Sequence, residues 1–356
     1  MSRYVVALRG LWAKINLRTL FFLLGIGVLA LMVFAAGPHE LWEAALKVSW
    51  ALPMALLVWA MVYAVNAYAF GIIIKRNVLA MPLSRYSIFR YTVAGYAINY
   101  ITPMGLLGGE PYRVMELKPY LGVERATGSV LLYAMMHICS HFIFWIAACG
   151  VVVFTIESLS TSLSIALLAI VFASLGGIFL FFRVYRKGMI LVLANKIKCW
   201  PLIGKRIRHK IENGEERLQM IDDNIGSLLL EHRRAFFSSL GLELLARFVG
   251  CWEIWLFMAA LGYQATFADA FIIVALSSLF ANLLFFSPLQ LGTREGGIFI
   301  SLQLLTAHFG GGGMGEREVL ALALAISLAT RLREFIWIGI GLLLMKLGHR
   351  PTSVLR

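Results

Sequence analysis

The sequence predicts an all-α polytopic membrane protein, with about six full transmembrane helices and two re-entrant helical hairpins arranged as an inverted repeat. Three observations lead to this fold class. The 356 residues are 60% hydrophobic and only 14% charged, which is too little polar surface to cover a soluble domain. Several apolar runs reach the roughly 20 residues that cross a bilayer core. Two short stretches rich in proline and glycine interrupt those runs at matching places.

The apolar runs set the order of the predicted elements. Six of them are long enough for a full span, at about 19–36, 49–74, 126–156, 161–182, 235–261 and 319–345. Three shorter apolar pieces lie at 88–101, 268–286 and 298–308. The first interrupting stretch, NYITPMGLLGGEPYR from Asn99 to Arg113, follows the piece at 88–101 and is called the first motif here. The second motif, NLLFFSPLQLGTREGG from Asn282 to Gly297, follows the piece at 268–286.

Loop charges set the predicted orientation, because Lys and Arg gather in cytoplasmic loops. Residues 126–182 contain no Lys or Arg, whereas 183–234 are strongly basic and include the run GKRIRHK. The N-terminal tail carries four basic residues and no acid. We therefore expect both termini and the 183–234 helical linker to be cytoplasmic. The first motif then belongs to a hairpin that enters from the cytoplasm, and the second to one that enters from outside. A broken pair of full spans is the alternative to each hairpin.

The net charge of +13 has a related explanation. In a soluble protein it would suggest nucleic acid, but here the positive-inside rule accounts for it. Anionic lipid headgroups are the partner expected for such a surface, and we expect no nucleic acid. A second copy of the chain or a lipid-synthesis enzyme is a further candidate partner.

The two motifs indicate an internal repeat within a single membrane domain. They share three positions in register: Pro103 with Pro288, Thr102 with Ser287, and Glu110 with Glu295. The shift of 185 residues also places the span at 49–74 on the span at 235–261. We therefore predict a first repeat at 49–156 and a second at 235–346, inverted because one extra crossing lies between them. The alternative is a chance likeness between two Gly/Pro turns.

Inverted repeats with broken helices at matching places are typical of transporters. In lipid, irregular backbone is tolerated only where protein buries it or where it lines a cavity. Half-helix N-termini would direct positive dipole ends toward an anion in that cavity. We therefore predict that the motifs line one cavity near the midplane, with five uncharged or acidic candidate ligands. These are Asn99, Thr102, Glu110, Asn282 and Glu295.

Four arginines complete the predicted substrate-binding set, because a charge in the bilayer costs about 2.5–3.5 kcal/mol and is rarely kept without a partner or a use. They are Arg113, Arg247, Arg294 and Arg331. A guanidinium can bind a phosphate through two parallel hydrogen bonds. For Arg113 the alternative is an anchor at the cytoplasmic interface.

Several of the intramembrane charges have more than one possible partner. Glu243 and Arg247 stand at i and i+4 on one helix, so they form either a structural ion pair or part of the substrate site. Arg331 could pair with Glu295 or with Glu110 across the cavity. Arg331 also shares a helix face with Glu334, whereas Arg333 points elsewhere.

Cofactor signals are weak. There is no Walker A sequence, so ATP is not expected to be used by this chain. The four cysteines have no metal-binding spacing and are interpreted as packing residues. His137 and His141 stand at i and i+4 without a third ligand, so we expect polar residues that face the bundle, with a proton relay as the alternative. No metal or other cofactor is predicted.

The motifs also resemble a known family. Asn99, the TP at 102–103, the GGE at 108–110 followed by Arg113, and the SPLQLGTRE at 287–295 are similar to signatures of the flippase-like transmembrane domain of lysylphosphatidylglycerol synthases. This family includes stand-alone members and hopanoid-associated membrane proteins. Its members commonly show P-x-G-x-G-x-R-E in the second motif, whereas Gln290 replaces one glycine here.

This resemblance implies lipid translocation between leaflets of the bacterial cytoplasmic membrane, through two re-entrant hairpins and without a nucleotide cofactor. The sequence ends at Arg356 without an aminoacyl-transferase region, so we expect a protein that moves a lipid and not an enzyme that makes one. Aminoacylated phosphatidylglycerol, a hopanoid, a polyprenyl-phosphate carrier and a plain phospholipid remain candidate substrates. The alternatives are an intramembrane lipid-modifying enzyme and an accessory subunit of a lipid or envelope-glycan synthesis complex.

Overall fold

The computed structural model is helical throughout the part of the chain that it describes. Those residues are 37–75, 83–102, 108–156, 158–198, 211–283, 293–306 and 315–347, with 27, 30, 34 and 209 singly. The helices in order are α3 (Pro38–Lys47), α4 (Ala51–Lys75), α5 (Arg85–Ile101), α6 (Gly109–Leu121), α7 (Val123–Thr155), α8 (Thr161–Lys187), α9 (Met189–Lys198), α11 (Glu215–Glu231), α12 (Arg233–Ala260), α13 (Phe267–Leu283), α14 (Thr293–Leu305) and α15 (Glu316–Lys346).

The helices agree with the predicted elements wherever both are described. Each apolar run from 49–74 onward corresponds to one helix, in the predicted order. The predicted first span at 19–36 and the central loops of both motifs, 103–107 and 284–292, lie outside the described residues. The predicted linker at 183–234 contains α9 and α11, and α11 packs against α7.

Three described helices are long and apolar enough to cross a bilayer, namely Ala51–Lys75, Val123–Thr155 and Thr161–Arg183. Helix α13 is apolar but shorter. Helices α12 and α15 have 28 and 31 residues, so length does not limit them. Both carry several Glu and Arg side chains, which lowers their hydropathy. The apolar character of the chain therefore gives the membrane location, while the number of crossings stays a prediction.

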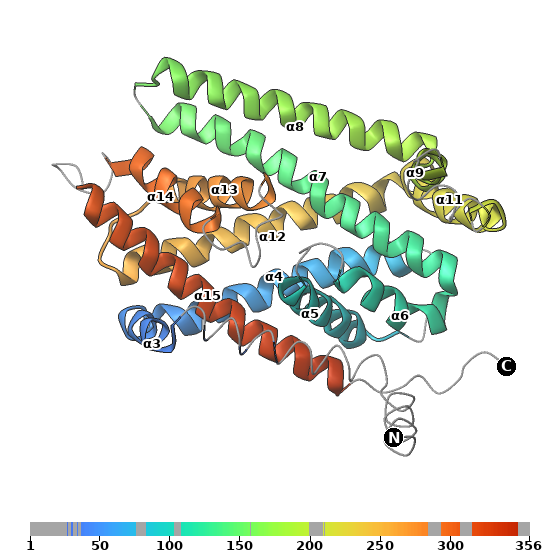
Figure 1. The fold of residues 1–356 in the computed structure, drawn as a ribbon, viewed down its shortest axis with the longest axis horizontal. Helices are drawn as coiled ribbons and strands as arrows, with labels where there is room; N and C mark the ends of the chain where they lie inside the picture. The colour runs from blue at the N-terminus through green and yellow to red at the C-terminus, as the bar shows by residue number, and fades with distance from the viewer. Residues whose placement is uncertain are drawn as a thin grey trace, which may run out of the picture.

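Helices α4 and α12 pack along each other in the middle of the bundle (Figure 1). Helix α7 covers one side and contacts α6, α12 and α13, and α8 lies along its outer side. Helix α15 runs diagonally across the other side and packs on α5 and α14. The bundle also contains two pairs of short helices that pack on each other: α5 with α6, and α13 with α14.

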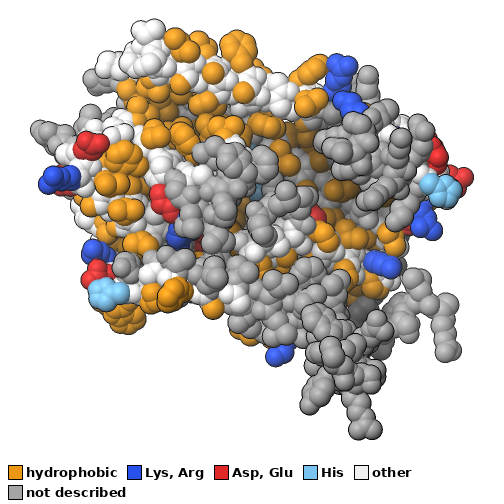
Figure 2. All heavy atoms as spheres, in the orientation of Figure 1, with side chains coloured by type: hydrophobic (Ala, Val, Ile, Leu, Met, Phe, Trp, Pro, Cys, Tyr) orange, Lys and Arg blue, Asp and Glu red, His pale blue; other side chains and the backbone are white. Residues whose placement is uncertain are grey.

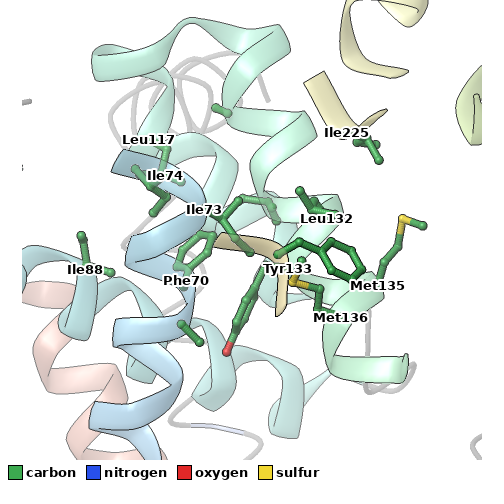
Figure 3. Close-up of a cluster of buried hydrophobic side chains, with 14 of the residues drawn as sticks. Phe70, Ile73, Ile74, Ile88, Leu117, Leu132, Tyr133, Met135, Met136 and Ile225 are labelled. Atoms are coloured by element: carbon green, nitrogen blue, oxygen red, sulfur yellow. The ribbon is translucent and has the colours of Figure 1, made fainter. Parts of the chain in front are cut away.

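Apolar packing holds the bundle together. In one cluster Phe70 and Ile73 of α4 meet Tyr133 and Met136 of α7 (Figure 3). A second cluster joins α13, α14 and α15. Outside the bundle, α8 exposes a stripe of large apolar side chains: Ile165, Leu168, Phe172, Leu175 and Phe179. Figure 2 shows hydrophobic side chains over much of the surface, with the visible charges mostly toward the two ends. This distribution fits a protein surrounded by lipid.

Local signals explain where several helices begin. Ser84 and Ser160 cap α5 and α8, each accepting a hydrogen bond from a backbone N–H three residues later, at 3.1 and 3.2 Å. Asp222 of α11 accepts from the first N–H groups of α9, at 2.9 Å each from Ile190 and Leu191. This contact ties the two linker helices together.

Glycines allow the short helices to approach their neighbours closely. A Cβ at Gly109 of α6 would overlap the carbonyl oxygen of Gly95 on α5. In the second half, a Cβ at Gly297 of α14 would lie 2.7 Å from the Cα of Ser277 on α13. Backbone-to-backbone contacts of this kind leave no room for a side chain.

The Gly109 contact gives a stability prediction. Gly109→Ala should destabilise the protein by about 1–3 kcal/mol or more, because the backbone of Gly95 cannot move aside as a flexible side chain can. Gly150→Ala on α7 is the matched control, since a Cβ there meets nothing within 4 Å. Thermal unfolding in detergent, followed by size-exclusion chromatography of heated samples, measures both. Equal melting behaviour of the two variants would contradict the close contact.

Candidate functional site

A cavity of about 320 Å³ lies inside the bundle. Its walls come from α4, α5, α6 and α7 in the first half and from α12, α13, α14 and α15 in the second. Helices α3, α8, α9 and α11 contribute no described residue to these walls. Residues from both segments that were predicted to be repeats, 49–156 and 235–346, therefore line one cavity.

Eight of the nine predicted site residues line this cavity. They are Asn99, Thr102, Glu110, Arg113, Arg247, Asn282, Arg294 and Arg331. The ninth, Glu295, is not among the lining residues but accepts a hydrogen bond from Nε of Arg331 at 2.9 Å. Pro103 and Pro288 lie outside the described residues, so the turns that they were predicted to make are not placed.

The first motif fixes the N-terminus of α6 against α5. Asn99 accepts from the backbone N–H of Gly109 at 2.6 Å and donates to Oε1 of Glu110 at 3.3 Å. Glu110 in turn accepts from Nη1 of Arg113 at 3.1 Å. One amide side chain thus satisfies a free helix N–H and orients the acid one residue later.

Arg113 lies in the cavity wall, 1% exposed. Its guanidinium carbon lies 4.8 Å from the ring centre of Tyr96 and 5.4 Å from that of Tyr133. Nη2 donates to the backbone oxygen of Thr92 at 3.4 Å. Aromatic faces and one carboxylate together stabilise this cation away from water.

The second motif meets α15 through two ion pairs. Arg294 and Glu295, in the first turn of α14, bind Glu334 and Arg331 respectively. Of the two partners that the sequence left open for Arg331, the structure brings it to Glu295. Asn282 differs from its counterpart Asn99, because its amide donates back to the Ser278 oxygen of its own helix at 2.7 Å. Both motifs therefore contribute residues to the cavity, but their asparagines form different hydrogen bonds.

A third buried ion pair joins three helices. Arg333 of α15 donates to both carboxylate oxygens of Glu253 on α12, at 2.6 and 2.9 Å. Trp59 of α4 donates to Oε2 of Glu253 at 2.8 Å, and its ring lies 3.8 Å from the Arg333 guanidinium carbon. The sequence offered no partner for Arg333, because 80 residues separate it from Glu253.

Glu243 and Arg247 do not pair with each other, so the structural ion pair suggested by their spacing is wrong. Oε2 of Glu243 lies 2.7 Å from Nδ1 of His137 on α7. Arg247 donates from Nε to Oγ of Ser140 and from Nη2 to the His137 oxygen, both at 2.7 Å. Helix α7 packs beside α12, so cross-helix partners replace the partner one turn away.

Sequence reasoning missed the aromatic and amide lining. Tyr96 and Tyr133 join their hydroxyls at 3.0 Å, and Asn66 donates to the Tyr96 hydroxyl at 3.2 Å. Tyr63 and Tyr100 also line the cavity. The available signal was the position of these polar groups in the middle of apolar helices.

Several buried polar atoms of the cavity have no hydrogen-bond partner among the described residues. They are Asn66 Oδ1, Glu110 Oε2, Arg113 Nε, His141 Nδ1, Glu243 Oε1 and Arg333 Nη1. Buried polar groups normally find a partner in protein, water or ligand. Their concentration in one cavity indicates a site for polar ligands. No group of three potential metal ligands occurs among the described residues.

Fold and site together define a membrane protein, all-α over the described residues, with a charged cavity lined by helices from both ends of the chain. The chain belongs to the family described as the lysylphosphatidylglycerol synthase TM region, whose family model matches residues 22–336. Comparisons with curated proteins and with solved structures gave no match. Family membership makes this a membrane protein tied to lipid metabolism and confirms the resemblance seen in the motifs.

The Arg333–Glu253 pair gives a second stability prediction. Arg333→Gln should destabilise the protein by about 3–5 kcal/mol, because it leaves a buried carboxylate uncompensated. Arg217→Gln is the control: this arginine also pairs with a glutamate, Glu124, but is 77% exposed. The control should change stability by about 0.5 kcal/mol or less. Thermal unfolding in detergent compares them, and similar losses in both would show that burial does not matter here.

Proposed function

We propose that this protein is a lipid flippase of the bacterial cytoplasmic membrane, which moves an anionic or aminoacylated lipid between leaflets. One observation carries the proposal: one cavity inside an apolar bundle is lined by charged residues from both motifs, Glu110 and Arg113 from the first and Arg294 from the second. Charges inside a membrane mark the path of a polar substrate, because each is costly to keep there. Family membership supports a role with lipids.

We infer a topology of six full spans, two re-entrant hairpins and an inverted repeat, with both termini cytoplasmic. Helices α5 and α13 both have 17 residues, and α6 and α14 both have 13. At 1.5 Å per residue none of these reaches across a bilayer core of about 30 Å. Equivalent pairs also pack alike: α5 with α15 as α13 with α7, and α6 with α7 as α14 with α15. These matches support a two-fold relation between the halves.

In this proposal the headgroup enters the cavity while the tails stay in lipid. The arginines Arg113, Arg247, Arg294 and Arg331 stabilise the phosphate. The carboxylates Glu110 and Glu295 orient arginines through the ion pairs described above and can meet an amine if the headgroup carries one. No metal or nucleotide takes part in this scheme.

A lipid-modifying enzyme is the second candidate, favoured by the 2.7 Å contact between His137 and Glu243. A carboxylate that orients a histidine is common in acid–base catalysis. However, the only side-chain hydroxyl that contacts the His137 ring among the described residues is that of Tyr96, at 3.5 Å. Transport accounts for the cavity charges from both motifs, whereas catalysis at His137 accounts only for the charge of Glu243.

Lipid translocation in proteoliposomes tests the function. The purified chain, reconstituted with traces of fluorescent phospholipids of several classes, should expose inner-leaflet label to dithionite rapidly and for some classes only. Glu295→Ala and Arg331→Ala should slow this about tenfold or more, because each breaks the Arg331–Glu295 ion pair at the cavity. The control variants Arg317→Ala and Glu318→Ala replace exposed residues of α15, the helix that carries Arg331. They should keep the wild-type rate. Unchanged translocation in the first two variants would refute the site.

Mass spectrometry of the same vesicles distinguishes the two functions. Under transport, the lipids keep their masses while they change leaflet. A new lipid mass that appears only with the wild-type chain would instead establish an enzyme.

Single-cysteine labelling tests the proposed hairpins, in a chain whose native cysteines are replaced. Arg85→Cys and Lys118→Cys flank α5 and α6 and are both exposed, so they should react only with reagent on the cytoplasmic side. Gln264→Cys and Gln303→Cys flank α13 and α14 and should react only from outside. Labelling of either pair from opposite sides would replace that hairpin by two crossings.

A further inference from the structure

Arg247 differs from the other arginines of the cavity. Each of the others is bonded to a carboxylate: Arg113 to Glu110, Arg294 to Glu334, Arg331 to Glu295, and Arg333 to Glu253. Arg247 forms no ion pair with a carboxylate of the described chain. Its two bonds go to neutral oxygens of α7, the Ser140 hydroxyl and the His137 carbonyl. Among the cavity arginines it is therefore the one most available to a new anion.

The two bonds also orient the Arg247 guanidinium. Nε and Nη2 are held at 2.7 Å from their oxygens on α7, while Nη1 makes no hydrogen bond to a described residue. A guanidinium that is fixed on one edge presents its remaining N–H groups in a defined direction. This is the geometry in which an arginine binds a phosphate oxygen without reorganising first.

The charge of Arg247 is already balanced at longer range. Glu243 lies one turn earlier on α12 and is 1% exposed, and its Oε1 has no hydrogen-bond partner. Its Oε2 contacts Nδ1 of His137, whose side chain is 25% exposed. With Glu243 ionised and His137 neutral, these three residues carry no net charge. An anion bound at Arg247 would therefore add an uncompensated negative charge inside the bundle.

We propose that Arg247 binds a phosphodiester monoanion and that the His137–Glu243 pair takes up one proton from water as it does so. The proton adds to the histidine–carboxylate pair, no bond in the ligand is made or broken, and the occupied site is again neutral. This inference deepens the proposed function and rests on it: the headgroup phosphate would cross together with a proton.

The other polar groups of the cavity are weaker candidates for taking up the proton than the His137–Glu243 pair. They include Tyr63 and Asn66 on α4, Tyr96 on α5, Glu110 and Arg113 on α6, Tyr133 and His141 on α7, Arg247 and Glu253 on α12, Ser277 and Ser278 on α13, and Arg331, Arg333 and Glu334 on α15, all of which line the same cavity. The tyrosines, Asn66 and the serines are neutral, and each of the other carboxylates is bonded to an arginine: Glu110 to Arg113, Glu253 to Arg333, and Glu334 to Arg294. Helices α8 and α11 contribute no described residue to the cavity. Among the described residues, His141, whose ring centre lies 5.4 Å from that of His137, is the competing acceptor that remains.

This coupling has a defined pH dependence. Because the ligand-bound form holds one more proton, binding should be strongest at low pH. Where the free pair is unprotonated, affinity should fall about tenfold for each unit of pH increase. By the same linkage, a proton gradient would drive the anion toward the side where protons are scarcer.

Isothermal titration calorimetry of the full chain in phosphatidylcholine nanodiscs tests the proposal. One titrant is dimethyl phosphate, a soluble phosphodiester, and the other is dihexanoyl phosphatidylglycerol, a lipid. Both keep a single charge from pH 6 to 9, so protons that are taken up belong to the protein. Measurement in two buffers of different ionisation enthalpy gives their number, which should approach one per bound anion at alkaline pH. Response to the lipid alone identifies a headgroup site, and response to both identifies a general phosphodiester site.

Variants separate the parts of the proposal. Arg247→Gln should abolish binding of both probes, whereas Arg217→Gln on the surface should leave it unchanged. Glu243→Gln mimics the protonated acid and should bind the anion without proton uptake and with little dependence on pH. His141→Gln should keep uptake near one proton, which assigns the proton to the His137–Glu243 pair.

Three results would overturn the inference. These are binding by wild type with equal heats in both buffers, unchanged binding by Arg247→Gln, and no binding of either probe by folded protein. Translocation and calorimetry fail independently. A chain that moves lipid but binds anions without protons refutes only the coupling. A chain that couples binding to protons but moves no lipid refutes only the proposed flippase.

Discussion

Pairing of buried charges is the constraint on which this structure depends. Three residues within one turn of α15, Arg331, Arg333 and Glu334, bind acids and a base on α12 and α14. In an apolar surrounding each of these charges is tolerable only with its partner in place. The pairs therefore define where α15 lies relative to both neighbours, and apolar contacts alone, which are non-directional, would not. The same ion pairs therefore set the position of α15 and supply charged groups to the cavity.

The same pairing controls what the cavity can do. Four of its arginines are bonded to carboxylates, so a ligand must either exchange for one of them or use the remaining free edges. The free N–H groups of Arg247 and the unpartnered oxygens of Glu110 and Glu243 are available for such bonds. This arrangement suits the reversible binding of the proposed headgroup, because ligand bonds would replace existing ones and the net gain would be small. For the proposed flippase, weak and reversible binding serves passage between leaflets better than tight capture.

Close backbone contact complements the charges. Gly95 with Gly109, and Ser277 with Gly297, bring the short helices against their neighbours in each half. Small residues at such crossings maximise packing where lipid supplies no hydrophobic drive between helices. The short helices are therefore held firmly at one end, while their polar first turns face the cavity. This combination presents Glu110 and Arg294 on rigid elements, as a selective site requires.

The sequence by itself determined the helical membrane class, the helices from residue 49 onward, the matching motifs and most of the charged residues that line the cavity, because bilayer thickness and the cost of buried charge act on any chain. The family resemblance also rested on motif residues that can be read directly. Only the tertiary structure decided the partners. Glu243 bonds to His137 instead of Arg247, and Glu253 meets Arg333 at a distance of 80 residues along the chain. Helix periodicity shows which residues share a face, but it carries no information about which neighbouring helix that face will meet.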